Sequence, residues 1–254
     1  MRILLLGGTS EATALALRLS DIPGVQAILS LAGRTSAPRL PPVPTRIGGF
    51  GGAEGLARYL RAERIDALVD ATHPFAARIS ANAAAAARAA GVPLVALVRP
   101  PWQAGEGDRW REVSDMGEAA RAIGEVPRRV FLTVGRLELD AFRAAPQHFY
   151  IVRTIEPIAA DALPRLVTIE DRPPFDEAAE RALMARERVE VLVTKNSGAA
   201  ATAPKLAAAR VLGVPIILVA RPPRPDGVES VESVEAALAW LASHPAAPET
   251  LRGV

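Results

Sequence analysis

The chain has 254 residues, of which 50% are hydrophobic and 23% are charged. This length and composition describe a globular protein of one large or two ordinary domains and exclude disorder and a peptide-sized scaffold. Cysteine is absent, which excludes disulfides, thiolate nucleophiles and cysteine-held zinc or iron–sulfur centres. With only three histidines, scattered along the chain, we expect no metal site.

Arginine supplies almost all of the positive charge. Lysine and arginine together number 30 against 28 acidic residues, and the only lysines are Lys195 and Lys205. Basic residues form no stripe and aromatic residues make up 4%, so we expect no nucleic-acid partner. Apolar runs are too short for a membrane span or a signal peptide. We therefore expect a cytoplasmic protein without a membrane partner, and the oligomeric state stays open.

Short apolar runs alternate with helical patterns along the chain, which predicts βαβ units around parallel sheets. Predicted strands cover residues 2–6, 25–31, 67–70, 94–98, 129–134, 149–153, 189–194 and 216–220. Predicted helices cover residues 10–19, 53–61, 76–90, 116–124, 177–186, 199–212 and 234–242.

An internal repeat sets the domain organisation. Residues 67–101 align without a gap on residues 189–223, at an offset of 122, with 14 of the 35 pairs identical. We therefore predict an α/β fold of two Rossmann-like parallel-sheet domains related by internal duplication: an N-terminal domain over 1–125 and a C-terminal domain over 126–254. Because parallel sheets bind ligands beyond the carboxyl ends of their strands, we expect the ligand cleft between the two domains.

The first predicted strand runs directly into a glycine-rich turn. Gly7 and Gly8 let backbone amides approach a phosphate, and Thr9 and Ser10 add hydroxyl donors at the start of a helix. This arrangement favours a phosphate site, although it is not the GxGxxG fingerprint. The alternative is a tight turn with Ser10 as helix N-cap and Glu11 next to the helix dipole.

Arg34 follows the second predicted strand, where a site for NAD carries an acidic residue and a site for NADP carries arginine. The position therefore indicates NADP. The alternative is an ordinary surface arginine in an arginine-rich chain.

Two polar turns follow the repeated strand. In the first, Thr72 and His73 are candidates for cofactor binding and proton donation, or His73 bonds a neighbouring carbonyl oxygen. In the second, Lys195 aligns with His73 and is the other candidate proton donor, or a solvated side chain. Hydroxyl and amide donors beside Lys195 indicate an anion or carbonyl site; they are Thr194, Asn196 and Ser197.

Several enzyme classes lack their motifs here. Neither tyrosine has a lysine four residues later, which excludes a short-chain dehydrogenase, and no Walker, GxSxG or zinc motif occurs. Gly135, in the first turn of the second half, fits a role in ligand binding or in packing equally well.

Together, the motifs resemble the precorrin-6A reductase family of cobalamin biosynthesis. In order along nearly the whole chain they are residues 7–12, 70–76, 99–102 with 107–110, 133–135 and 194–198. Ala199 departs from the pattern, since the family often has a second glycine there. The resemblance implies a two-domain Rossmann-like reductase that uses NADPH to reduce one ring double bond of a tetrapyrrole, precorrin-6A, to give precorrin-6B.

The resemblance also suggests roles for the candidate residues. The pyrophosphate would lie on Gly7, Gly8, Thr9 and Ser10, and the 2′-phosphate on Arg34. The remaining cofactor contacts would come from Thr72, Gly135, Thr194, Asn196 and Ser197. Substrate carboxylates would meet Arg78, Arg99 and Arg221, and the proton would come from Lys195, His73 or water.

Three alternatives remain open from the sequence. One is cobalt-precorrin-6A reductase of the anaerobic route, whose sequences look similar. Another is a non-catalytic module that binds NADP or a small anion, because duplicated α/β domains also occur in binding proteins. The third is a nucleotide-sugar transferase.

Overall fold

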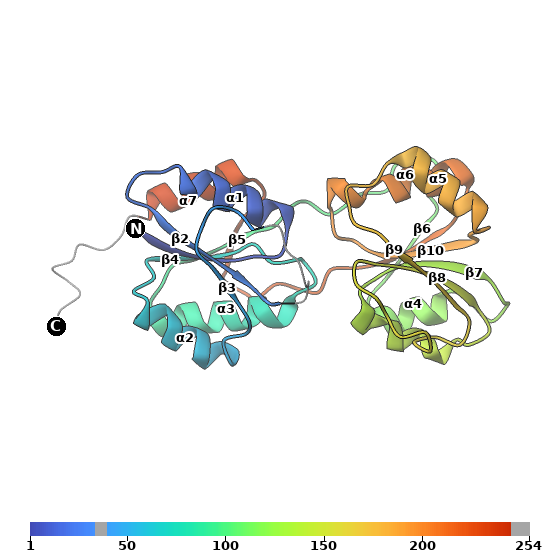
Figure 1. Cartoon of the computed structure of the whole chain (residues 1–254), viewed down its shortest axis with the longest axis horizontal. Helices are drawn as coiled ribbons and strands as arrows, with labels where there is room; N and C mark the ends of the chain where they lie inside the picture. Colours follow the sequence, from blue (N-terminus) through green and yellow to red (C-terminus); the bar gives the residue numbers. More distant parts are fainter. Residues whose placement is uncertain (34–39, 245–254) are drawn as a thin grey trace. The chain divides into compact units, whose positions relative to one another are not determined.

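The computed structural model describes residues 1–33 and 40–244. It divides into two compact units, one of residues 1–100 with 222–254 and one of residues 101–221 (Figure 1). The units differ from the predicted ranges 1–125 and 126–254, because residues 101–125 belong to the second unit and the chain returns to the first unit after Arg221.

The first unit is a six-stranded parallel sheet in the order β12-β5-β4-β1-β2-β3, with helices on both faces. Its strands are β1 (Arg2–Leu6), β2 (Gln26–Leu31), β3 (Thr45–Ile47), β4 (Ala67–Asp70), β5 (Leu94–Leu97) and β12 (Glu229–Val231). Helices α1 (Ser10–Ser20) and α7 (Val234–Ser243) cover one face, and α2 (Gly52–Ala62) and α3 (Ala77–Ala90) cover the other (Figure 1).

The second unit repeats this architecture, with the strand order β6-β11-β10-β7-β8-β9. Its strands are β6 (Trp110–Val113), β7 (Arg129–Thr133), β8 (Phe149–Thr154), β9 (Leu166–Glu170), β10 (Val191–Lys195) and β11 (Ile216–Val219). Helices α5 (Glu177–Arg186) and α6 (Pro204–Leu212) lie on one face, and α4 (Met116–Ala122) packs with the 3-10 segment η1 (Arg136–Ala144); a short 3-10 turn, η2 (Ala200–Thr202), precedes α6.

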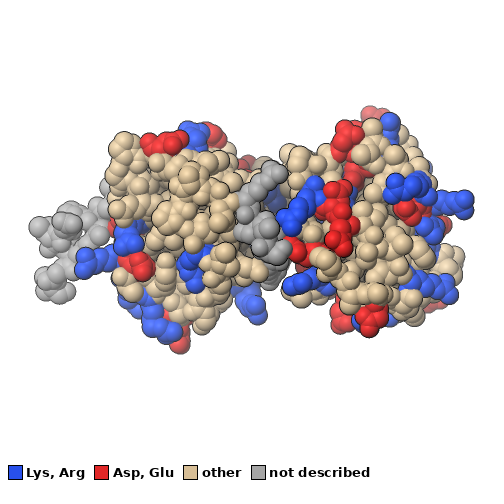
Figure 2. All heavy atoms as spheres, in the orientation of Figure 1, with Lys and Arg blue, Asp and Glu red and all other residues tan. Residues whose placement is uncertain are grey.

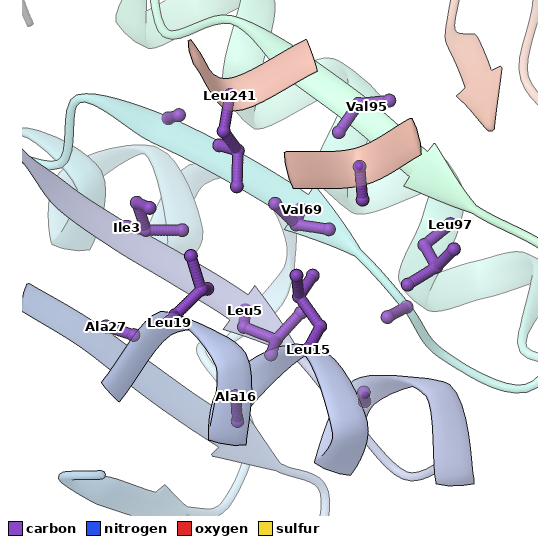
Figure 3. Close-up of a cluster of buried hydrophobic side chains, with 14 of the residues drawn as sticks. Ile3, Leu5, Leu15, Ala16, Leu19, Ala27, Val69, Val95, Leu97 and Leu241 are labelled. Atoms are coloured by element: carbon purple, nitrogen blue, oxygen red, sulfur yellow. The ribbon is translucent and has the colours of Figure 1, made fainter. Parts of the chain in front are cut away.

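Burial of apolar side chains holds these layers together. In the first unit, Leu15 and Leu19 of α1 lie one helical turn apart and pack on Ile3 and Leu5 of β1, with Leu241 of α7 beside them (Figure 3). All five side chains are at most 4% exposed. Because full burial of one such side chain contributes about 1.5–3 kcal/mol, this cluster fixes the face on which α1 and α7 lie. No described helix is long and apolar enough to span a bilayer.

The duplication is confirmed by equivalent contacts as well as by strand order. The backbone N–H of Arg2, at the start of β1, donates to Asp66 at 2.7 Å. In the second unit the backbone N–H of Arg129, at the start of β7, donates to Glu190 at 2.8 Å. Each acid thus holds the first residue of its strand, β1 or β7, in the same way.

The sheet registers correct the gap-free alignment in one place. Strands β5 and β11 correspond at an offset of 122, but β4 and β10 correspond at 124. The second unit therefore has two residues fewer in the turn after β10. Lys195 is therefore equivalent to Ala71. The gap-free alignment, which pairs Lys195 with His73, is wrong at this position.

Each unit takes its outermost strand on the β5 or β11 side from the other half of the chain. β12 pairs with β5, and β6 pairs with β11. The two repeated Arg-Pro-Pro segments, residues 99–101 and 221–223, contain the points where the chain passes from one unit to the other. Proline has no N–H to donate to a neighbouring strand, so β5 and β11 end before these segments and the chain leaves the sheet there.

Candidate functional site

A cavity of about 550 Å³ lies in the first unit, where β1, β2 and β4 end. Helix α1 leaves β1 on one face of the sheet and α3 leaves β4 on the other, so this is the switch point where open parallel sheets bind ligands. The volume is typical of small-molecule and cofactor sites. Polar lining groups come from Gly7, Ser30, Thr72, Arg78 and Asn82. The structure thus brings together three of the predicted site residues, Gly7, Thr72 and Arg78.

The two glycines of the first turn serve different purposes. A Cβ on Gly7 would lie 2.5 Å from Leu29 Cδ1, so this glycine is required for packing against β2. Gly8 has a φ of +121°, which favours glycine, and a Cβ there would meet nothing within 4 Å. The open side of the bend is therefore at Gly8.

Thr9, and not Ser10, caps helix α1. Thr9 is the N-cap of α1: its hydroxyl accepts from Ala12 N–H at 3.1 Å and donates to Ala71 O at 2.8 Å. The N-cap role considered for Ser10 is wrong, since Ser10 is the first helical residue and donates to Glu11 at 3.1 Å. Thr9 therefore ties the turn after β1 to the end of β4.

Glu11 and Arg99 form a partly buried ion pair in the first unit, with Arg99 Nη1 and Glu11 Oε2 2.5 Å apart. Their side chains are only 10% and 24% exposed, so water screens the pair weakly. Arg99, predicted for substrate carboxylates, thus already has one carboxylate partner, beside the first turn.

The turn after β4 holds Thr72 and His73 through short local bonds. Both the N–H and the hydroxyl of Thr72 donate to Asp70 Oδ1, at 3.1 and 2.7 Å. His73 Nδ1 accepts from Phe75 N–H at 3.3 Å. A neutral His73 ring therefore carries its proton on Nε2.

Sequence reasoning missed a glycine loop in this cavity. Gly48–Gly52 connects β3 to α2, and all five of its residues line the cavity. Arg46 clamps the loop: its guanidinium donates to Ser30 Oγ and Gly48 O, both at 2.9 Å, and lies 3.8 Å from the Phe50 ring centroid. Four glycines in five positions directly before a predicted helix were the available signal.

In the second unit, Lys195 lies at the end of β10 and pairs with a residue that the sequence did not indicate. Lys195 Nζ donates to Glu138 Oε1 at 2.9 Å, and the two side chains are 15% and 30% exposed. A Cβ on Gly135 would lie 2.3 Å from Glu138 Oε2. Of the two roles left open for Gly135, its contacts therefore favour packing, because its missing side chain makes room for this carboxylate.

Asn196 uses its side chain to hold the chain near the first crossing. Its Oδ1 accepts from Trp102 N–H at 2.8 Å and its Nδ2 donates to Trp102 O at 3.1 Å. The Asn196 backbone oxygen accepts from Arg221 Nε at 2.8 Å. Asn196 is buried, as are its neighbours Thr194 and Ser197. These contacts make Asn196 an anchor for both crossing segments.

Three charged side chains are buried together in the second unit: Arg153 of β8, Glu180 of α5 and Lys205 of α6, called the charge cluster below. Arg153 pairs with Glu180, and its guanidinium lies 3.6 Å from the Phe175 ring centroid. Lys205 Nζ is 5.1 Å from the Trp102 ring centroid. Burial lowers the pKa of Lys205 to about 7, helped by the charges of Arg153 and Lys195 and opposed by Glu180.

Charge elsewhere is dispersed. Over the described residues on the face in view, acidic and basic side chains are interspersed (Figure 2). No group of three or more acidic or histidine side chains among the described residues is placed to hold a metal. Arg78 pairs with no carboxylate of the described residues. Arg34 lies outside the described residues.

Comparison with known proteins identifies the family. The model of "Precorrin-6x reductase CbiJ/CobK" matches residues 2–242. The chain belongs to this family. It is 49% identical to a precorrin-6A reductase of Rhodococcus erythropolis, over 95% of this chain and 98% of that protein, and 52% identical to one of Sinorhizobium sp, over 87% and 85%. A solved structure of CobK precorrin-6A reductase has a TM-score of 0.92 at 46% identity and covers 98% of this chain and 99% of its own.

These matches confirm the predicted two-sheet Rossmann-like fold and the predicted enzyme, a precorrin-6A reductase of cobalamin biosynthesis. Cobalt-precorrin-6A reductases are more distant: one from Priestia megaterium is 32% identical over 87% of this chain and 90% of that protein. NADPH and the individual site residues stay predictions.

The charge cluster generates a prediction about pH. Because the pKa of Lys205 is about 7 in the fold and about 10.5 when unfolded, the unfolded chain binds more protons between these values. This side chain therefore makes the free energy of unfolding rise with pH across that window, and contributes no slope below about pH 7. We expect Lys205→Met to be more stable than the native chain at pH 7, with the difference shrinking towards pH 10. Urea unfolding at several pH values measures it; a difference independent of pH would contradict it.

Proposed function

We propose that this chain reduces a ring double bond of metal-free precorrin-6A to give precorrin-6B, with NADPH as the reductant. The supporting observation is the 46–52% identity to precorrin-6A reductases over most or all of the chain, against 30–32% to the cobalt-precorrin-6A reductases. A cobalt-containing substrate is the second candidate, because both groups share the family.

We place NADPH at the cavity of the first unit. When bound, it would supply the hydride. The bend at Gly8 leaves room for a phosphate at the start of α1, and the Arg78 guanidinium at the cavity wall forms no ion pair with any residue that the structure describes. Thr72 lines the same cavity, with its hydroxyl fixed by Asp70. The 2′-phosphate is assigned to Arg34 from its position after β2.

The second unit would supply the proton, from Lys195. Glu138 Oε1 accepts from Lys195 Nζ at 2.9 Å, which holds the ammonium in place at the end of β10. His73 is the weaker candidate, because its Nδ1 already accepts a backbone hydrogen bond. In this proposal four further residues contribute to the ligand site by surrounding Lys195. They are Gly135, Thr194, Asn196 and Ser197. Arg78, Arg99 and Arg221 are proposed for the carboxylates of the substrate.

The proton donor is tested by Lys195→Met, with His73→Asn as the parallel variant. General acid catalysis is worth about 10²–10⁴-fold, so we expect Lys195→Met to lose that factor in kcat while the Kd for NADPH is unchanged. The assay follows oxidation of NADPH in the presence of precorrin-6A by absorbance. Normal turnover by Lys195→Met would rule out this role, and a comparable loss in His73→Asn alone would transfer it to His73.

Glu138 is tested by Glu138→Gln, which keeps a hydrogen-bond acceptor and removes the charge. Without the Glu138 carboxylate the Lys195 ammonium loses the ion pair that positions it, so we expect kcat to fall while the Kd for NADPH is unchanged. An equal loss of kcat and of affinity for NADPH would mean that Glu138 only supports the fold.

Cofactor choice is tested by Arg34→Ala. We expect the preference for NADPH over NADH to fall at least tenfold, because an arginine recognises the 2′-phosphate that NADH lacks. The ratio of kcat/KM for the two cofactors measures it. The control is Arg18→Ala, which removes an exposed arginine of α1. A preference that survives the substitution would show that another residue reads the phosphate.

A further inference from the structure

Duplication allows the two units to be compared position by position. The registers of β2 and β8, the ends of α2 and α5, and the ends of α3 and α6 fix which residues are equivalent. Three equivalent pairs lie at the cavity or directly next to it: Ser30 and Arg153, Leu56 and Glu180, and Ala83 and Lys205.

In the first unit these positions carry small or apolar side chains and the space beside them is open. Ser30 and Leu56 line the cavity of about 550 Å³, and Ala83 directly follows Asn82, which also lines it. The glycine loop Gly48–Gly52 also lines this cavity, and Phe50 is its only residue with a side chain.

In the second unit the same three positions form the charge cluster. The residues Arg153, Glu180 and Lys205 are 6%, 3% and 4% exposed, so their side chains occupy the interior. Phe175, from the loop equivalent to the glycine loop, stacks on Arg153. The place that is a cavity in the first unit is therefore filled by the long side chains of Arg153 and Lys205, the Glu180 carboxylate and the Phe175 ring.

We infer that the charge cluster closes the second unit's counterpart of the cofactor cavity, so that the chain binds one nicotinamide dinucleotide, in the first unit. The naming of the ligand rests on the proposed function, whereas the closure rests on the paired positions alone. Burying unlike charges gives little net stability compared with an apolar filling. The cluster thus removes a second nucleotide site without thereby adding much stability.

The ligand arm of the test measures binding of NADPH by isothermal titration calorimetry. We expect one NADPH per native chain. Ser30→Leu fills the first cavity with neutral bulk and should weaken binding at least tenfold, whereas Ser30→Ala, which removes only the hydroxyl, should stay within about threefold. If Ser30→Leu unfolds the chain, Gly49→Leu with Gly49→Ala replaces the pair, because Gly49 has open space around its missing Cβ. Two NADPH per native chain, or unchanged affinity in the filled variants, would overturn the inference.

The cavity arm needs no ligand and so separates the two proposals. The triple variant Arg153→Ser, Glu180→Leu and Lys205→Ala gives the second unit the side chains of the first. Its crystal structure should show a new cavity beside β8, and the same region filled by other side chains would refute closure by the cluster. If the native chain binds no NADPH but the triple variant opens this cavity, the cofactor proposal fails and the closure stands.

Discussion

The parallel direction of all strands in each sheet is the constraint on which the site depends. Because the strands run the same way, the turns after β1, β2 and β4 meet at one edge of the first sheet, and those after β7 and β10 meet at one edge of the second. Residues far apart in sequence are thereby brought together. Thr9 reaches Ala71 O in this way, and Lys195 reaches Glu138. The chemistry of each unit follows from which side chains stand at that edge.

The sequence predicted the central strands and most helices because their apolar runs are long and fully buried. It missed β3, β6, β9 and β12, since outer strands such as Thr45–Ile47 and Glu229–Val231 carry too few apolar residues to stand out. The same omission hid the exchange between halves. β6 joins the second sheet because it pairs with β11, and β12 joins the first sheet because it pairs with β5. The local sequence pattern of a strand does not show with which strand it pairs.

The site divides in the same way. Turns next to buried strands were found, because Gly8 and Lys195 follow directly from a strong apolar pattern. Their partners were not: Glu138 has the sequence pattern of an ordinary surface acid, and its contact with Lys195 is visible only in the fold. Asn196 has partners that the sequence did not indicate, because its side-chain amide holds the backbone of Trp102. Its contact with a cofactor stays a prediction.

The two lysines of this arginine-rich chain have one requirement in common. A guanidinium cannot give up its proton under ordinary conditions, whereas an ammonium can. At the sheet edge, Lys195 needs that ability if it is to deliver a proton to a substrate. In the interior, the pKa of Lys205 is lowered to about 7, so it can stand beside Arg153 as a neutral amine. A second arginine there would leave an uncompensated buried charge next to a single carboxylate, Glu180. If Lys195 delivers the proton, arginine would fail at both positions for the same chemical reason, one at the proposed site of proton transfer and the other in the buried charge cluster.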